Sequence, residues 1–195
     1  NQSFSPSRRN SLAASPETNK HSNDEISTFY NKISSNRIYE TDFFQASPCS
    51  PQDICDQILK AIQHDETREP DAKYVAYFQP STNTYAPVWQ LEQLYCAALA
   101  EKNIIGLAVG TRPDVLPDAV IDLFEALADE TWLTVELGLQ STHDRTLQFL
   151  NRGHDYQTFL DAYRRLQERN INVCIHLILG LPGENRDDIL ATAEE

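Results

Sequence analysis

The sequence contains no methionine, and its six glycines all lie at or after Gly106. A chain without methionine does not begin at a start codon, and its last residues, "GENRDDILATAEE", have the pattern of a helix that has not yet met a stop signal. We therefore expect a fragment of a longer protein. The late appearance of glycine indicates that the organisation of the chain changes along its length.

The sequence also lacks an excess of basic residues. Its 29 acidic and 16 basic side chains give a formal net charge of −13, which argues against a generic surface for nucleic acid or for anionic membranes. A specific RNA substrate stays open, because a local patch can differ from the total charge. No apolar run is long enough to span a bilayer and no signal peptide is visible, so we expect no membrane contact.

The cysteines form no CxxC pair, and they fall in different predicted elements. A disulfide framework or a zinc site is therefore not expected, and a reducing, cytoplasmic location fits the sequence best. The four residues concerned are Cys49, Cys55, Cys96 and Cys174.

Two regions of the chain differ in composition. Residues 1–50 are rich in Ser, Asn, Thr and Glu, as in "SPSRRNSLAASPETNKHSNDE", and this predicts a low-complexity, disordered insertion. Residues 51–195 carry regular apolar patterns and are numerous enough to form one core. Their first segment, "SPQDICDQILKAIQH", opens with a Ser-Pro helix signal and places Ile54, Ile58 and Ile62 on one helical face.

Strand-like and helix-like segments then alternate at intervals that suit βαβ units, which predicts an α/β fold with a parallel sheet or barrel. The predicted strands are Tyr74–Phe78, Ile104–Val109, Leu133–Leu139 and Val173–Leu179. The predicted helices between them are Pro87–Lys102, Pro117–Asp129 and Tyr156–Arg169.

The predicted strands end on polar residues or glycines: "QPSTNTY", "GTRPD", "GLQSTHD" and "GLPGEN". In α/β barrels the active site lies at the carboxyl ends of the strands, so these four segments predict a ligand site on one face. Gly180 and Gly183 allow the backbone to approach a ligand closely, or they form a simple turn. The sequence contains no Ser-His-Asp arrangement, P-loop or HExxH motif, and we assign no catalytic residue.

Several residues near the strand ends have two interpretations each. The guanidinium of Arg112 suits a carboxylate or phosphate, but it can equally pair with Asp114. Glu136 interrupts an apolar strand, which indicates a buried ion-pair partner or a ligand contact. His176 also lies within a strand, where a satisfied core histidine is the commoner case. Asp155 precedes a predicted helix and can cap it.

Five segments together resemble the radical S-adenosylmethionine superfamily: "AYFQPSTNTYAP", "GLAVGTRPDVLPD", "VELGLQSTHDRTL", "LNRGHD" and "HLILGLPGEN". They are most similar to the YhcC-like group, which is related to the catalytic subunit of elongator. The resemblance covers residues 50–195 and implies about four βα units of a six-stranded partial TIM-like barrel. In such relatives a segment like "NQSFSP" directly follows three cluster-binding cysteines, so those metal ligands are expected before Asn1 and none among the four cysteines of this chain.

The resemblance implies a cofactor chemistry. Three cysteine thiolates hold a 4Fe–4S cluster, whose open iron binds the amino and carboxylate groups of S-adenosylmethionine. One electron, from a donor such as flavodoxin or ferredoxin, then yields methionine and a 5′-deoxyadenosyl radical that abstracts hydrogen from a substrate. The substrate is unknown; the elongator relationship makes transfer RNA one candidate.

The resemblance also implies cofactor contacts. Gln79, Thr82 and Asn83 occupy the strand end that usually contacts the methionyl amine, where they replace the common Gly-Gly-Glu type. Gly180 and Leu181 match the strand that brackets adenine. Three further residues stand in shared motifs and are assigned only to the cofactor or substrate face: Arg112, Arg152 and His154.

On the third predicted strand, Glu136, Gln140 and Ser141 match positions that contact ribose or carboxylate in the superfamily. Because successive side chains of a strand point to opposite faces, Glu136 and Gln140 are expected in the barrel mouth. The residues expected to pack against helices are Val135, Leu137 and Leu139.

Three functions follow from these patterns. The first is a radical enzyme that is active only as the full-length protein, so the fragment alone is expected to bind no intact cluster and to be inactive. The second is a non-catalytic barrel module without a cluster that binds a nucleotide-like ligand or a protein partner. The third is an ordinary barrel enzyme that uses Glu136 and His176 as acid and base.

Overall fold

The computed structural model describes residues 50–66, 72–79 and 81–195. All of them belong to one compact unit, Glu40–Glu195. The predicted disordered insertion therefore lies, apart from Ser50, outside the described residues, as does Cys49.

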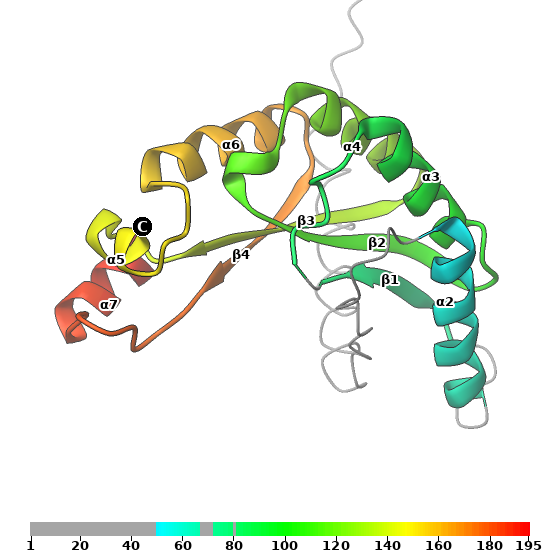
Figure 1. The fold of residues 1–195 in the computed structure, drawn as a ribbon, viewed down its shortest axis with the longest axis horizontal. Helices are drawn as coiled ribbons and strands as arrows, with labels where there is room; N and C mark the ends of the chain where they lie inside the picture. Colours follow the sequence, from blue (N-terminus) through cyan, green and yellow to red (C-terminus); the bar gives the residue numbers. More distant parts are fainter. Residues whose placement is uncertain (1–49, 67–71, 80) are drawn as a thin grey trace, which may run out of the picture. The chain divides into compact units, whose positions relative to one another are not determined.

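The centre of the fold is a four-stranded parallel sheet in the order β1-β2-β3-β4 (Figure 1). The first strand begins and ends at the predicted residues. The other three strands begin or end one or two residues away from the predicted bounds. The last strand ends two residues early, because the chain beyond it turns at Gly180, where φ is +80°. The strands are β1 Tyr74–Phe78, β2 Ile104–Thr111, β3 Trp132–Gln140 and β4 Asn172–Leu177.

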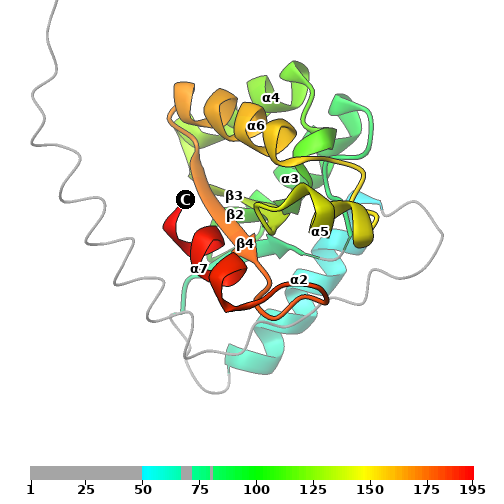
Figure 2. The same cartoon turned by 90° about the vertical axis from the view of Figure 1, so that its left-hand side faces the viewer.

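Helices follow the strands along the chain, and α3, α4 and α6 lie on the same side of the sheet (Figures 1 and 2). The long helices were predicted from their apolar period, whereas the short α5 and the 3-10 turn η1 carry too few residues to show one. The helices are α2 Pro51–Glu66, α3 Val88–Leu99, α4 Asp118–Glu130, α5 Asp144–Phe149, α6 Tyr156–Glu168 and α7 Arg186–Glu194, with η1 at Pro113–Val115.

Polar side chains fix where several helices begin. At the start of α2, the Asp53 carboxylate accepts from the Ser50 backbone N–H at 2.8 Å, and the Ser50 hydroxyl accepts from the Asp53 N–H at 3.2 Å. Asp155 caps α6, as predicted, by accepting from the Thr158 N–H at 2.8 Å. These bonds satisfy N–H groups that have no partner inside the helix.

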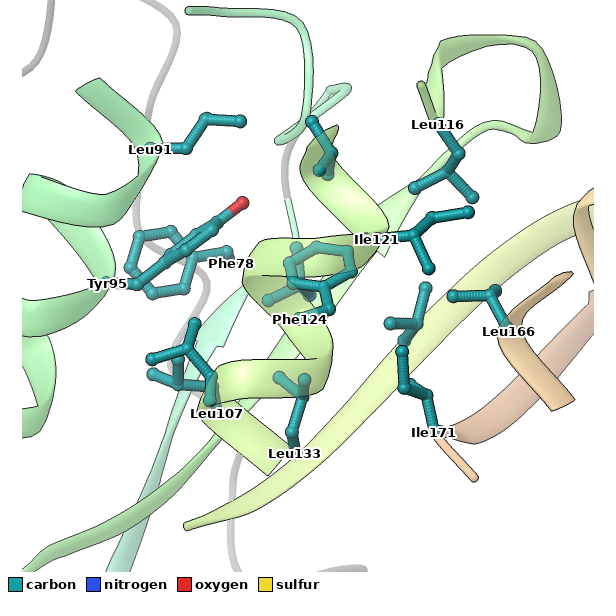
Figure 3. Packing of buried hydrophobic residues seen from close by; sticks show 14 of the residues in the cluster. Phe78, Leu91, Tyr95, Leu107, Leu116, Ile121, Phe124, Leu133, Leu166 and Ile171 are labelled. Carbon is teal, nitrogen blue, oxygen red and sulfur yellow. The ribbon is translucent and has the colours of Figure 1, made fainter. Parts of the chain in front are cut away.

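The hydrophobic core lies between the sheet and these helices. Figure 3 shows the Phe124 ring of α4 among Tyr95, Leu107 and Leu133, and Phe124 is fully buried. Tyr95 also meets Phe78 edge to face, with ring centroids 5.1 Å apart. The side chains expected to pack against helices all belong to this core: Val135, Leu137 and Leu139.

The alternation along β3 leaves Glu136, Gly138 and Gln140 on the opposite face of the sheet. The architecture is therefore the predicted α/β class, with parallel strands that are each followed by a helix. Among the described residues, no helix is long and apolar enough to cross a membrane.

Candidate functional site

The loop after β1 is fastened to the end of β2. Asn83 Nδ2 donates to the Phe78 carbonyl at 2.7 Å and to the Gly110 carbonyl at 3.0 Å. The Tyr95 hydroxyl donates to the Asn83 carbonyl at 2.7 Å, and the Thr84 hydroxyl donates to the Val115 carbonyl at 2.7 Å. The Asn83 amide hydrogens are thus used within the protein, and the loop is held as a fixed part of the strand-end face.

The other two predicted contacts of this loop are Gln79 and Thr82. Gln79 directly follows β1 and is exposed, and Thr82 is half-buried. Between them Ser81 has a φ of +67°, a left-handed conformation that is uncommon for a residue with a side chain. Gln79 is therefore open to solvent, whereas the Thr82 carbonyl accepts from the Tyr85 N–H at 3.4 Å within the loop.

At the end of β2, Arg112 is paired with Asp114. Arg112 Nε donates to Asp114 Oδ1 at 2.9 Å, and Arg112 Nη2 donates to Asp114 Oδ2. Burial by itself would raise the pKa of Asp114, but the hydrogen bonds and charge of Arg112 outweigh it and lower that pKa. The ion pair that the sequence left open as an alternative for Arg112 is confirmed.

Three residues meet at the end of β3. Arg152 Nη2 donates to the Gly138 carbonyl at 3.2 Å, and its Nε is buried without a hydrogen-bond partner among the described residues. A Cβ added at Gly138 would lie 2.8 Å from Gln140 Nε2 and 3.1 Å from Arg152 Nη2, so both side chains lie directly over this glycine. Burial, followed by the charge of Arg112, lowers the pKa of Arg152.

The sheet is irregular at Gln140, at the end of β3. The β3–β4 register shifts between Gly138 and Gln140, and Gln140 has a φ of +74°. The Gln140 carbonyl still accepts from the Ile178 N–H at 2.9 Å, so the pairing continues beyond the bulge. Bulges and left-handed non-glycine residues cost free energy and are frequent beside functional sites.

Glu136 lies deeper on the same face and joins three strands. Its Oε2 accepts from the Tyr77 hydroxyl of β1 and lies 2.9 Å from His176 Nε2 of β4. Tyr77 reaches Glu136 across β2, which places the small residues Ala108 and Gly110 opposite them in register. The Glu136 side chain is 11% exposed and that of His176 is 44% exposed. Glu136 is thus the partly buried, paired carboxylate that its position in the strand indicated.

Ser141 lies in a second set of contacts, between the loops after β3 and β4. Its hydroxyl is fully buried, donates to Glu184 Oε1 and accepts from the His143 N–H at 3.1 Å. Arg145 Nη2 lies 2.7 Å from Asp188 Oδ2 of α7. The hydrogen bond from Arg145 is the main reason that the pKa of Asp188 is lowered. These contacts fasten the two loops to each other.

Beyond β4 the backbone requires glycine. Gly180 and Gly183 have φ values of +80° and +87°, and a Cβ at either position would meet nothing within 4 Å. Leu181 between them is buried. The open space beside Gly180 is compatible with both interpretations from the sequence, a turn and a close approach to a ligand.

The structure therefore brings Arg112, Gln140 and Arg152 into one cluster at the ends of β2 and β3, and places Glu136 below it. The sequence did not indicate two residues that take part in these contacts, Tyr77 and Glu184. Tyr77 alternates with core residues, so its face could have been inferred, but its partner could not. Glu184 sits in a glycine-rich turn, where nothing local indicates a bond to Ser141.

The described residues do not provide a site for an iron–sulfur cluster. Among them, no group of three or more His, Cys, Asp or Glu side chains could hold a metal ion. Cys55 on α2 has its Sγ 3.8 Å from the Ala97 carbonyl, Cys96 is exposed on α3, and Cys174 lies on β4. A three-thiolate cluster thus does not fit this part of the chain.

Comparison with known proteins places these features in a family. The family model described as "Radical SAM superfamily" matches residues 37–195. The uncharacterized protein YtqA of Bacillus subtilis is 45% identical over 136 residues, which cover 70% of this chain and 42% of that protein. Protein YhcC of Escherichia coli is 48% identical over 125 residues, which cover 63% of this chain and 40% of that protein. The chain thus spans about two fifths of the length of these relatives.

Two further similarities are more distant. The tRNA uridine(34) acetyltransferase of Methanocaldococcus jannaschii is 31% identical over 88 residues, or 45% of this chain and 16% of that protein. The solved structure of archaeal Methanocaldococcus infernus Elp3 superposes with a TM-score of 0.59 at 22% identity, covering 75% of this chain and 38% of that one. This structural likeness supports the partial TIM-like barrel architecture that the sequence predicted.

Proposed function

The chain belongs to the radical S-adenosylmethionine superfamily, and we propose that its strand-end cluster binds S-adenosylmethionine as part of a radical enzyme. The observation that carries the proposal is the unpartnered, buried Nε of Arg152 beside Gly138 and Gln140. A buried guanidinium N–H without a partner is costly, and a carboxylate is the group that pairs best with a guanidinium.

The other residues of the cluster fit the rest of such a ligand. The Gln140 amide can donate to and accept from ribose hydroxyls, and the lack of a side chain at Gly138 leaves room for both Gln140 and Arg152. Gln79 and Thr82 stand at the rim for the amino end, and the open backbone at Gly180 can lie against the adenine. The loops are already fastened, so little ordering free energy is lost on binding.

In a full-length protein that also held a reduced 4Fe–4S cluster, the bound S-adenosylmethionine would supply the radical chemistry that takes a hydrogen atom from a substrate. The residues of this chain orient the ligand and exclude water. We propose that Arg152 holds the carboxylate, that Gln140 fixes the ribose, and that Glu136 accepts hydrogen bonds beneath them. The electron would come from a donor such as flavodoxin or ferredoxin.

Transfer RNA is the substrate class we propose to test first. It is supported by the similarity to the tRNA uridine(34) acetyltransferase of M. jannaschii. The net charge of −13 works against binding of a polyanion, so such a substrate would depend on a local basic patch.

The test is anaerobic incubation of the reconstituted full-length gene product with S-adenosylmethionine and dithionite. We expect 5′-deoxyadenosine to form, and we expect Arg152→Lys to weaken binding of S-adenosylmethionine by roughly tenfold, because lysine cannot make the forked contact. Arg164→Lys is the matched control, since Arg164 is an exposed residue whose only partner described is Asp161. Binding of the ligand without any cleavage would favour a non-catalytic module, and no binding would refute the proposal.

One observation favours a second function. His176 Nε2 lies 2.9 Å from Glu136 Oε2, which is the arrangement of a carboxylate that orients a histidine for acid–base chemistry. An enzyme of that kind would work in air without S-adenosylmethionine and would lose activity in His176→Gln. Activity that depends strictly on S-adenosylmethionine and on reducing conditions would exclude it.

A further inference from the structure

We propose that Arg112 does not contact the ligand and instead acts with Asp114 as a positioning pair for Arg152. This inference rests on the proposed function, because it assigns a task to Arg152. It also changes the expectation for Arg112, which the family resemblance placed only on the cofactor or substrate face. The positioning pair is defined as the side chains of Arg112 and Asp114.

The side chains of the positioning pair bind each other. Arg112 uses Nε, at 2.9 Å, and Nη2 to hold the two carboxylate oxygens of Asp114. This is the forked geometry in which a guanidinium would otherwise receive a ligand carboxylate. Asp114 therefore occupies the Nε/Nη2 side of the Arg112 guanidinium, whereas Arg152 has an Nε that is buried and unpartnered among the described residues.

The positioning pair lies beside the turn that carries Arg152. A Cβ at Gly153 would stand 2.8 Å from Arg112 Nη2 and 3.9 Å from Asp114 Oδ2, so the pair packs directly against the backbone of the residue after Arg152. Gly153 has a φ of +77°, a conformation that glycine adopts readily and other residues rarely adopt. From the other side, the Arg152 N–H donates to the Leu147 carbonyl at 3.0 Å. The turn that carries Arg152 is held between these two contacts.

The positioning pair also balances charge at the strand ends. Arg112 and Arg152 are close enough that the charge of Arg112 contributes to the lowered pKa of Arg152, while Asp114 acts in the opposite direction. Without Asp114, the two guanidinium groups would repel each other and neither would be fixed. The carboxylate therefore lets two cations share one end of the sheet.

The decisive experiment compares Arg112→Ala with Asp114→Ala in the full-length gene product. The first removes a positive charge and the second a negative one. If the pair acts only through its electrostatic field, the affinity for S-adenosylmethionine changes in opposite directions. If the pair positions Arg152, both variants weaken binding, by roughly tenfold, the effect of misplacing one charge-assisted hydrogen bond.

A second probe separates positioning from general damage. 5′-Methylthioadenosine has the adenosyl group and lacks the carboxylate, so its affinity, measured by calorimetry, should stay within about twofold of the wild-type value. Asp118→Asn is the control, because Asp118 pairs with Arg165 at 2.6 Å on exposed helix surfaces. Equal losses for both ligands would overturn the inference, as would opposite effects of the two alanine variants.

A readout without ligand keeps the inference testable if the proposed function fails. The Nε–H of Arg152 is buried, so its proton should exchange slowly with solvent in the wild type. Its signal in a ¹H–¹⁵N correlation spectrum is assigned by its loss in Arg152→Lys. Exchange should become fast in both alanine variants and stay slow in Asp118→Asn. Slow exchange in either alanine variant would refute the positioning role, whereas absence of binding by the wild type would refute only the proposed function.

Discussion

Glu136 and His176 are joined through a single carboxylate oxygen: Glu136 Oε2 lies 2.9 Å from His176 Nε2 and also accepts from Tyr77. Strands β1, β3 and β4 are thereby linked on the face away from the core. Between these strands, the small residues Ala108 and Gly110 of β2 lie in register with Tyr77 and Glu136.

The first prediction concerns this link. Glu136→Ala removes the acceptor of both contacts, so the free energy of unfolding should fall by about 1–3 kcal/mol. Urea denaturation followed by circular dichroism measures the change. Glu92→Ala, on the exposed side of α3, is the control and should change stability by less than about 0.5 kcal/mol. Equal stability of the two variants would show that the link contributes nothing to folding.

The second prediction concerns the backbone of Gln140. Because its φ is +74°, Gln140→Gly should be more stable than Gln140→Ala by about 1 kcal/mol. Both variants lose the amide and should bind S-adenosylmethionine more weakly than the wild type. Thermal denaturation and calorimetry measure the two effects separately. Unchanged affinity in Gln140→Ala would remove Gln140 from the site, and an alanine variant as stable as the glycine variant would show that the conformation carries no strain.

The third prediction concerns the core. Phe124 is fully buried between α4 and the sheet, so Phe124→Ala should lower the free energy of unfolding by about 3–5 kcal/mol. Phe149→Ala is the matched control, because Phe149 is 68% exposed on α5 and should cost less than about 0.5 kcal/mol. Denaturant midpoints measure both. A small effect at Phe124 would contradict the packing shown in Figure 3.

The fourth prediction concerns the stability of the folded protein at acidic pH. The pKa of Asp188 is lowered from 3.8, first by the hydrogen bond from Arg145 and then by that from Asn185. A carboxylate whose pKa is lowered in the folded state stabilises it above the unfolded pKa, and this contribution is lost as the pH falls from about 3.8 through the folded value. Asp188→Asn should therefore flatten the decline of the melting temperature below about pH 4.

The control for this experiment is Asp129→Asn, on the exposed surface of α4. Melting temperatures between pH 6 and pH 3 should follow the wild type in the control and diverge from it in Asp188→Asn. An acid decline that is the same in all three proteins would mean that the contact between Asp188 and Arg145 does not contribute to stability.

The elements of the fold were largely readable from local patterns. The period of two along β3 places Val135 and Leu137 in the core and Glu136 on the other face, as the structure has it. The polar ends of the strands pointed to one edge of the sheet because parallel strands end together. The short α5 was not readable, since six residues show no period.

The contacts within the site were only partly readable. Arg112 was known to suit either a ligand or Asp114, and the structure shows it with Asp114. Ser141 matched a contact position of the family, and its hydroxyl is buried against Glu184. The partner of each side chain depends on which loop lies beside which strand. Neither sequence spacing nor residue type determines that arrangement.

The sequence by itself determined the alternation of strands and helices and the polarity of the strand ends, because hydrophobic period and capping act over a few residues. Only the tertiary structure decided that the Nε of Arg152 is buried without a partner above Gly138 and that Gln140 turns over the same glycine. Those features arise from the bulge between β3 and β4 and from the packing of distant loops, where the free energy depends on neighbours that the local sequence does not contain.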